Sequence, residues 1–333
     1  MKQGAAKRGV ERARIQLTAD VVSEVTAVRQ AWTQAVAAKQ VAAFAEQVRT
    51  SADASAEMGR RLESVGNFSR LERARQQVFY ADATMQLATA RHEAVAARER
   101  LVRALGLDDL QAANLKLPEQ LPELPSQPIL PGEASETLGD RRLDIRMAKA
   151  SLERVARSEG ITNITSFTDI ELGYRQTEAS GPEESESLSG YEVAVSLPFF
   201  DWGGMKREAM SARTLAAAND YAATLRNASS SLRETYSAYR TSYDLSSFYR
   251  DEVVPLRSLI SEENVMQYNG MLIGVFELLA DSRTQISSVM SAIKASEQFW
   301  MADSALQAAM MGQPMNVSVG AMAAAGGDEG AGH

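Results

Sequence analysis

The stretch QYNGMLIGVFELL, residues 267–279, joins two long helical patterns through a turn. Asn269-Gly270 is a dipeptide typical of turns, and an apolar helical pattern resumes directly after it. The sequence therefore predicts a helical hairpin with an apolar tip at residues 271–273. Because apolar groups exposed at a tip lower solubility unless a partner covers them, this tip is a candidate contact surface.

Long helices are predicted on both sides of this turn and again in the first half of the chain. Residues 10–58 contain neither Pro nor Gly, and their apolar residues recur every three or four positions, which predicts one helix about 70 Å long. A second helix follows the interruption at 64–69 and ends near 106. Two more run from about 205 to 269 and on to about 312. We expect a kink or break at Pro255.

Residues 107–139 form a linker that holds five of the nine prolines. Such a segment is expected to be extended and to lie against the helices. The tail at 313–333 is of low complexity, which favours disorder.

Strict alternation of apolar and polar residues replaces the helical period at 167–176 and 191–197. A polar loop joins the two segments, so we predict a β-hairpin at about 165–198. The apolar positions would form one face of it: Ile170, Leu172, Tyr174, Tyr191, Val193, Val195 and Leu197.

The helix-turn-helix pattern occurs twice. Phe68 and Glu72 match Ile273 and Glu277, each 205 positions later. We therefore divide the chain into a first repeat (1–106), the linker (107–139), a second repeat (140–312) and the tail (313–333). The first repeat lacks an equivalent of the short helix and hairpin at 141–204, so we expect that the chain is an N-terminally truncated form of a longer protein.

Composition excludes several classes of function. The 333 residues carry a net charge of −8 and no basic patch, which argues against a nucleic-acid partner. There is no cysteine, no apolar run of 18 residues and no signal-peptide pattern. No catalytic or phosphate-binding motif is present, so we expect no enzyme activity and no cofactor. The C-terminal region holds four methionines, whose thioethers could bind Cu(I): Met310, Met311, Met315 and Met322. Methionine more often fills gaps in helical packing, so we predict no metal site there.

Five stretches carry a more specific resemblance. They are ESVGNFSRLERARQQV (63–78), ARERLVRALGL (97–107), RRLDIRMAKASL (141–152), LPFFDWGGMKREAMSA (197–212) and YNGMLIGVFELLADSRTQ (268–285). Together they resemble the TolC family of outer-membrane efflux channels. Leu143 in place of a proline, and the YNGMLIGVFELL turn, resemble a subgroup associated with copper or heavy-metal resistance.

The resemblance implies a mainly α protein that works as a homotrimer. Each protomer adds long antiparallel helices to a periplasmic α-barrel and strands to one transmembrane β-barrel in the outer membrane. With one hairpin, this chain would form at best a defective barrel. The implied role is a passive conduit of a tripartite efflux system, with outer-membrane lipid, a periplasmic membrane-fusion adaptor and an inner-membrane pump as its partners.

The resemblance also assigns residues. It places the adaptor-docking turns at Val65, Gly66, Asn67, Phe68 and Ser69, and at Met271, Leu272, Ile273 and Gly274. It places a gate at Glu72, Tyr268 and Glu277, where three copies of an acidic ring would favour cations. A basic gate residue of some members falls at Ile273 here.

Simpler readings exist for each of these assignments. The hairpin could belong to a soluble domain, the tip residues could hold two helices together, and the glutamates could be solvated charges. The alternative function is a soluble cytoplasmic coiled-coil scaffold or a non-functional remnant.

Overall fold

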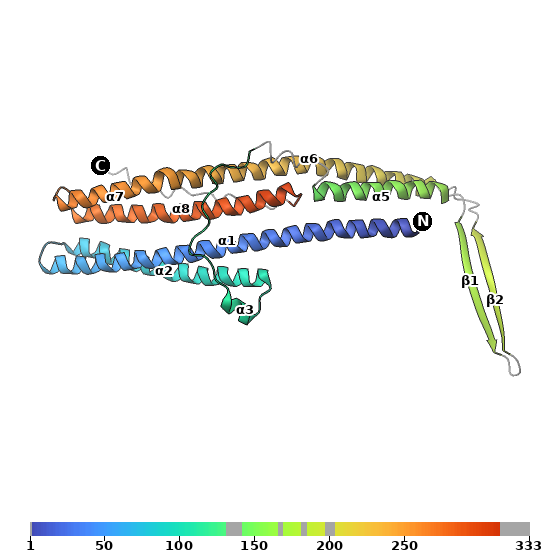
Figure 1. Ribbon diagram of the computed structural model, residues 1–333, viewed down its shortest axis with the longest axis horizontal. Coiled ribbons are helices and arrows are strands. Elements are labelled where there is room, and N and C mark those ends of the chain that lie inside the picture. The colour runs from blue at the N-terminus through green and yellow to red at the C-terminus, as the bar shows by residue number, and fades with distance from the viewer. Residues whose placement is uncertain (1, 131–141, 166–168, 181–184, 197–203, 314–333) are drawn as a thin grey trace. The chain divides into compact units, whose positions relative to one another are not determined.

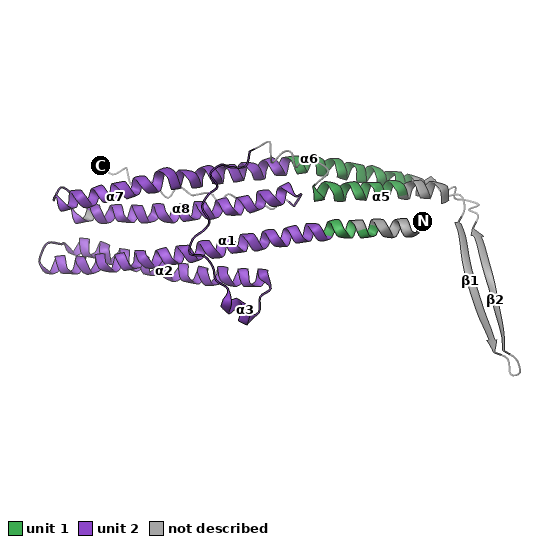
Figure 2. Ribbon diagram, in the orientation of Figure 1, with its two compact units in different colours: residues 1–16, 139–229 green, residues 17–138, 230–333 purple. Residues whose placement is uncertain are grey.

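The computed structural model describes residues 2–130, 142–165, 169–180, 185–196 and 204–313. The chain divides into two compact units, which Figure 2 shows in different colours. One unit comprises residues 1–16 and 139–229, and the other comprises residues 17–138 and 230–333. Each unit has its own packing and is described separately.

The larger unit contains a first helical hairpin, formed by residues 17–64 of α1 (Lys2–Ser64) and by α2 (Arg70–Leu105). The two helices lie side by side in Figure 1, and α1 is longer than the predicted helix at 10–58. Small side chains line their contact: Ala35 faces Ala97, and Ala45 faces Ala90. Because alanine is short, the helix backbones can approach closely along the hairpin. This is why an Ala-rich chain with few aromatic residues can form such long helices.

The second helical hairpin of this unit consists of the end of α6 (Gly204–Phe248), η1 (Tyr249–Val253), α7 (Val254–Asn269) and α8 (Val275–Met310). At Pro255, where a kink or break was expected, the regular α-helix is interrupted by a π turn. The helix continues through the π turn η1, in which the Val254 N–H donates to the Tyr249 carbonyl, and Pro255 lies in the first turn of α7. A proline ring clashes with the carbonyl four residues before it, and a wider turn gives that carbonyl room.

An aromatic cluster forms the core of the second hairpin. Phe299 of α8 is completely buried, and its ring lies 5.6 Å from that of Tyr239, 5.7 Å from that of Tyr243 and 5.0 Å from that of Trp300. Tilted and edge-on ring pairs at such separations add stability beyond the burial of their area. The cluster therefore fixes α6 against α8.

Side chains of α8 also reach the first hairpin within this unit. The Arg283 guanidinium lies 4.3 Å from the centre of the Phe79 ring and donates to the Gln76 side chain at 3.3 Å. At the other end of α8, Gln307 accepts a hydrogen bond from Arg29 of α1. These contacts join the two hairpins into one helical layer.

Residues 115–130 of the linker cross the helices of this unit as an extended strap. After the short helix α3 (Asp109–Asn114), its backbone is held by helix side chains rather than by other backbone. Lys39 donates to the Leu117 carbonyl at 2.9 Å, Trp300 to the Pro122 carbonyl at 3.1 Å, and Tyr243 to the Pro125 carbonyl at 3.0 Å. The Tyr239 hydroxyl accepts from the Ile129 N–H at 3.1 Å.

The smaller unit contains α5 (Leu143–Thr165) and the first part of α6. Arg142 is completely buried, where it pairs with both carboxylate oxygens of Asp144 and donates to the Ala228 carbonyl at 3.2 Å. Asp144, in the first turn of α5, also accepts from the Ile145 N–H at 2.8 Å, which satisfies one of the free N–H groups at the start of the helix. The LDI segment thus has a structural role in fixing α5 to α6.

Two strands in this unit, β1 (Asp169–Ser180) and β2 (Ser185–Ser196), pair antiparallel. The register places Ile170 opposite Val195, and Tyr174 opposite Tyr191. Positions two apart share a face of a strand, so the apolar positions of both strands fall on one face of the ribbon. Leu197, the last of the predicted set, lies outside the described residues.

Replacing Tyr239 by Phe should loosen the strap without disturbing the aromatic cluster. The ring stays, but the part-buried Ile129 N–H loses its acceptor, which costs about 1–2 kcal/mol. We expect faster hydrogen exchange at Ile129 and a lower midpoint of unfolding. Tyr80→Phe, on α2, is the matched control. Unchanged exchange at Ile129 would show that the strap is held without this bond.

Candidate functional site at the helix turns

The two helical hairpins of the larger unit end in turns of the same design. We define turn 1 as residues 62–69 and turn 2 as residues 267–274. In turn 1 the Gly66 N–H donates to the Glu63 carbonyl and the Asn67 N–H to the Leu62 carbonyl, both at 2.9 Å. Turn 2 repeats both bonds 205 positions later, from Met271 and from Leu272, at 3.0 and 2.9 Å. This pair of bonds is the Schellman motif that ends many helices.

The Schellman motif requires a left-handed backbone at one position. In turn 1 that residue is Gly66, with φ of 78°. In turn 2 it is Met271, with φ of 60°, although Gly270 stands directly before it. Gly270 has φ of −79° and needs no special freedom. The glycine of the Asn-Gly dipeptide is therefore not the left-handed residue of this turn.

Turn 1 is fixed by a capping box at the start of α2. The Ser69 hydroxyl accepts from the Glu72 N–H at 3.2 Å, and the Glu72 carboxylate accepts from the Ser69 N–H at 2.6 Å. Phe68 is only 8% exposed and lies beneath the turn, so in this conformation it is not offered to a partner. The assignment of Phe68 as a docking residue stays a prediction. The signal for the capping box, Ser-x-x-Glu at 69–72, was present in the sequence.

Turn 2 presents more apolar surface. Met271 is 93% exposed and Leu272 is 78% exposed, whereas Ile273 is partly buried. Gly274 occupies the position of Ser69, so α8 begins without a side-chain cap. In turn 1 the comparable exposed apolar residue is Val65, at 67%. Both turns thus expose backbone and apolar side chains suited to contact with another surface.

Of the three predicted gate residues, Tyr268 lies in turn 2, and Glu72 and Glu277 lie in the first turns of α2 and α8. No hydrogen bond or ion pair joins them to one another within the described residues. Glu72 is engaged in the capping box. Tyr268 is half-buried, and its hydroxyl makes no hydrogen bond within the described part of the chain. Glu277 is exposed in the first turn of α8, where a negative charge stabilises the helix dipole. A gate role for these residues stays a prediction.

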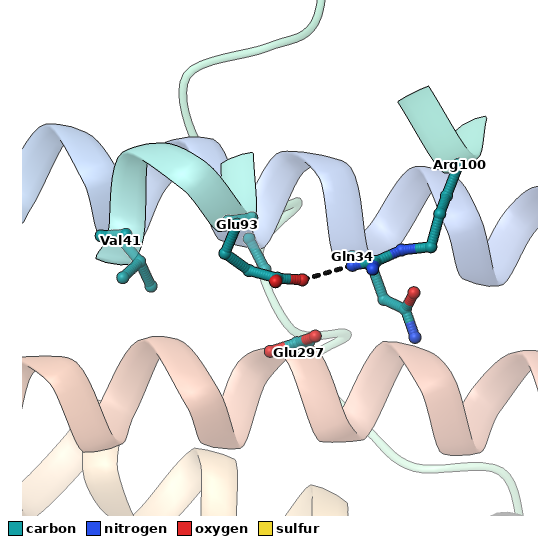
Figure 3. Close-up of a pocket in the computed structure, with 8 residues that line it drawn as sticks. Gln34, Val41, Glu93, Arg100 and Glu297 are labelled. Carbon is teal, nitrogen blue, oxygen red and sulfur yellow. Dashed lines mark hydrogen bonds and ion pairs between the residues drawn. The ribbon is translucent and has the colours of Figure 1, made fainter. Parts of the chain in front are cut away.

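A pocket of about 540 Å³ lies further along the hairpins, between α1, α2 and α8. Figure 3 shows Glu93 of α2 and Glu297 of α8 facing this space, with Arg100 paired to Glu93. Burial raises the pKa of Glu297. The positive charge of Lys294 acts to lower this pKa, and the negative charge of Glu93 acts to raise it. Since one carboxylate is already paired and alanines form much of the wall, the pocket offers no clear ligand chemistry.

The remaining predictions concern metals and membranes. Among the described residues there is no group of three or more His, Cys, Asp or Glu side chains able to hold a metal ion. Met310 and Met311 lie at the end of α8, and Met315 and Met322 lie outside the described residues. No helix in the described ranges has an apolar stretch long enough to cross a bilayer.

Comparison with solved structures gives strong matches along nearly the whole chain. A membrane protein from Pseudomonas aeruginosa matches with a TM-score of 0.78 at 21% identity, over 92% of this chain and 72% of that one. The Campylobacter jejuni CmeC outer-membrane channel matches with 0.79 at 16% identity, over 93% and 66%. The open state of the Neisseria gonorrhoeae MtrE outer-membrane channel matches with 0.75 at 19% identity, over 93% and 71%.

The chain has the TolC-type fold of these outer-membrane channels. No protein-family model matches its sequence, and no characterised protein does so by sequence alone. The TolC-type fold confirms the resemblance read from the five sequence stretches. It also confirms the long antiparallel helices expected from the helical period.

Glu297 should make the stability of the fold depend on pH. Because its pKa is raised in the folded protein, the folded state binds the proton more tightly than the unfolded state. The free energy of unfolding therefore falls as the pH rises above the ordinary value near 4.5. Glu297→Gln should raise the midpoint of thermal unfolding at neutral pH and flatten its pH dependence, whereas Glu234→Gln, at an exposed position, should do neither. If the midpoint of thermal unfolding of Glu297→Gln depended on pH as steeply as that of the natural protein, Glu297 would not be the cause of the pH dependence.

Proposed function

We propose that the chain is a protomer of an outer-membrane efflux channel. In this role it forms a passive conduit that opens into the periplasm and passes substrate from an inner-membrane pump through a periplasmic adaptor. The observation that supports this most strongly is the similarity of fold to solved outer-membrane channels over more than nine-tenths of the chain. The absence of catalytic motifs in the sequence agrees with a conduit.

The β-hairpin supports placement in the outer membrane. Strands of 12 residues with one apolar face have the length and pattern of transmembrane barrel strands. In lipid every backbone N–H and C=O must be paired, so a lone hairpin has to be completed by strands from other copies of the chain. We assign Ile170, Leu172, Tyr174 and the positions opposite them to the lipid-facing side.

An unpartnered apolar seam on α2 supports assembly as a homotrimer. Leu71, Val78 and Met85 follow one another at intervals of seven residues and are all exposed. Alanines lie three positions after each of them, also exposed. This is the a/d pattern of a coiled-coil seam, and the opposite side of α2 already packs on α1. We assign the seam to a helix of a neighbouring protomer.

Met85→Glu should disrupt this assembly. A carboxylate buried in an apolar seam is costly unless it is paired, so we expect the trimer fraction in mild detergent to fall by about tenfold or more. Gln77→Glu is the control, because it lies on α2 at a position beside the seam where coiled coils tolerate charge. The measurement is mass by light scattering. A fully trimeric Met85→Glu protein would contradict the assignment of the seam.

We assign the adaptor contact to turns 1 and 2. A Cβ added at Gly274 would meet nothing within 4 Å, so this position is open to an approaching helix. The φ of Gly274 is −80°, so a substitution there causes no backbone strain. Gly66 is less suitable for a test, because any side chain at its φ of 78° is strained.

Gly274→Trp should therefore block docking while leaving the fold intact. We expect export to be abolished, as measured by accumulation of ethidium and of Cu(I) in cells that carry the variant in place of the natural chain, with the trimer yield unchanged. Gly274→Ser is the control, since it is small and supplies a better helix cap. Normal export by Gly274→Trp would contradict the assignment of the adaptor contact to these turns.

Extraction separates the proposed channel from the alternative of a soluble scaffold. A channel protomer should be recovered from the outer-membrane fraction as a trimer only when detergent is present. Recovery of the chain in the soluble fraction without detergent would favour the scaffold.

A further inference from the structure

We propose that turn 2, and not turn 1, is the anchor of the adaptor contact, and that the side chain of Met271 is the anchoring group. The partner surface that fits it is an apolar patch flanked by basic side chains, on a separate protein. This inference rests on the proposed function and names the chemistry of its docking site.

The first observation is a comparison of helix ends within the chain. Four long helices end in the same Schellman bond pair, at residues 66, 106, 271 and 312. Gly66, Gly106 and Gly312 occupy the left-handed position in three of them. Met271 is the one residue other than glycine with positive φ in the described part of the chain. A side chain destabilises this backbone conformation, because its Cβ comes too close to the following carbonyl.

Packing against the described part of the chain does not compensate for this strain. Met271 is 93% exposed, so its side chain gains almost no packing in return. A glycine is present at the neighbouring position, Gly270, where the backbone does not require one. Turn 1 has the reverse order, Val65 followed by Gly66, and is unstrained. Residues in strained backbone conformations cluster at ligand-binding and switch sites.

The second observation is charge. Residues 57–75 around turn 1 contain five arginines and three glutamates, whereas the equivalent residues 262–280 around turn 2 contain three glutamates and no basic residue. None of Glu262, Glu263 and Glu277 takes part in an ion pair within the described residues. In turn 1, by contrast, Glu57 pairs with Arg60 and Arg61, and Glu63 pairs with Arg73.

The two observations define the partner. The exposed Met271 and Leu272 require an apolar surface, and the unpaired carboxylates around them favour basic groups at its rim. A methionine side chain is flexible and polarisable, which suits an anchor that adapts to an apolar surface. Turn 1, with its charges largely paired and Phe68 folded inward, serves as the secondary contact.

The test uses the purified full-length chain and a fluorescently labelled synthetic helical hairpin. The hairpin has an Ala-Leu-Gly tip flanked by lysines, and a second version has glutamates in place of the lysines. We expect the lysine version to bind the natural chain and the glutamate version to bind at least about tenfold more weakly. Equal binding of the two versions, or no binding of the lysine version, would overturn the proposed partner chemistry.

Variants of Met271 separate anchoring from a purely structural role. Met271→Gly relieves the strain, so hydrogen exchange at positions 271 and 272 should slow by about fivefold, while binding of the lysine hairpin should weaken by about tenfold. Met271→Asn, which tolerates the left-handed backbone, should also lose binding, and Met271→Leu should retain it. Slower exchange with unchanged binding in Met271→Gly would overturn the anchor.

Gly274→Trp distinguishes failure of this inference from failure of the proposed function. If Gly274→Trp blocks export but hairpin binding is insensitive to Met271, turn docking stands and the anchor is wrong. If Gly274→Trp exports normally, docking at the turns itself is wrong.

Discussion

The larger unit depends on the way its aromatic cluster holds the linker. Phe299 is buried among Tyr239, Tyr243 and Trp300, and three of these rings also bind the linker backbone through their polar groups. An extended, proline-rich segment has no internal hydrogen bonds, so its carbonyls need partners from elsewhere. The same side chains thus close the second hairpin and fix the strap that runs to it from the first. Alanine packing alone would make each hairpin but would not tie the two together.

The function proposed here follows from a division of labour along the chain. Alanine packing allows long helices to lie close together, and the linker joins the two hairpins. The helix turns carry the exposed apolar side chains that we propose as contacts. The two turns share their hydrogen bonds yet differ in the residue that takes the left-handed conformation and in the charge around it. Duplicated halves can in this way keep one backbone geometry while presenting different surfaces to a partner.

The sequence predicted the features that local chemistry decides. Helical periodicity located the four long helices, proline content located the linker, and alternation located the strands that pair in the structure. The features that it missed depend on residues far apart or on one φ angle. The bond between Tyr239 and Ile129 spans 110 positions, and no pattern indicates that Phe68 folds inward. The Asn269-Gly270 dipeptide located the turn, but nothing in the sequence indicated that Met271 would be its left-handed residue.

The π turn at Tyr249–Val253 also corrects the phase of a helix surface. The π turn contains one extra residue, which shifts every later position around the helix axis. In a regular helix, residues seven apart lie on nearly the same side, and across the π turn this holds for residues eight apart. Phe248 and Leu256 are eight apart and both exposed. The exposed side chains directly before and after the turn thus stay on one side of the helix.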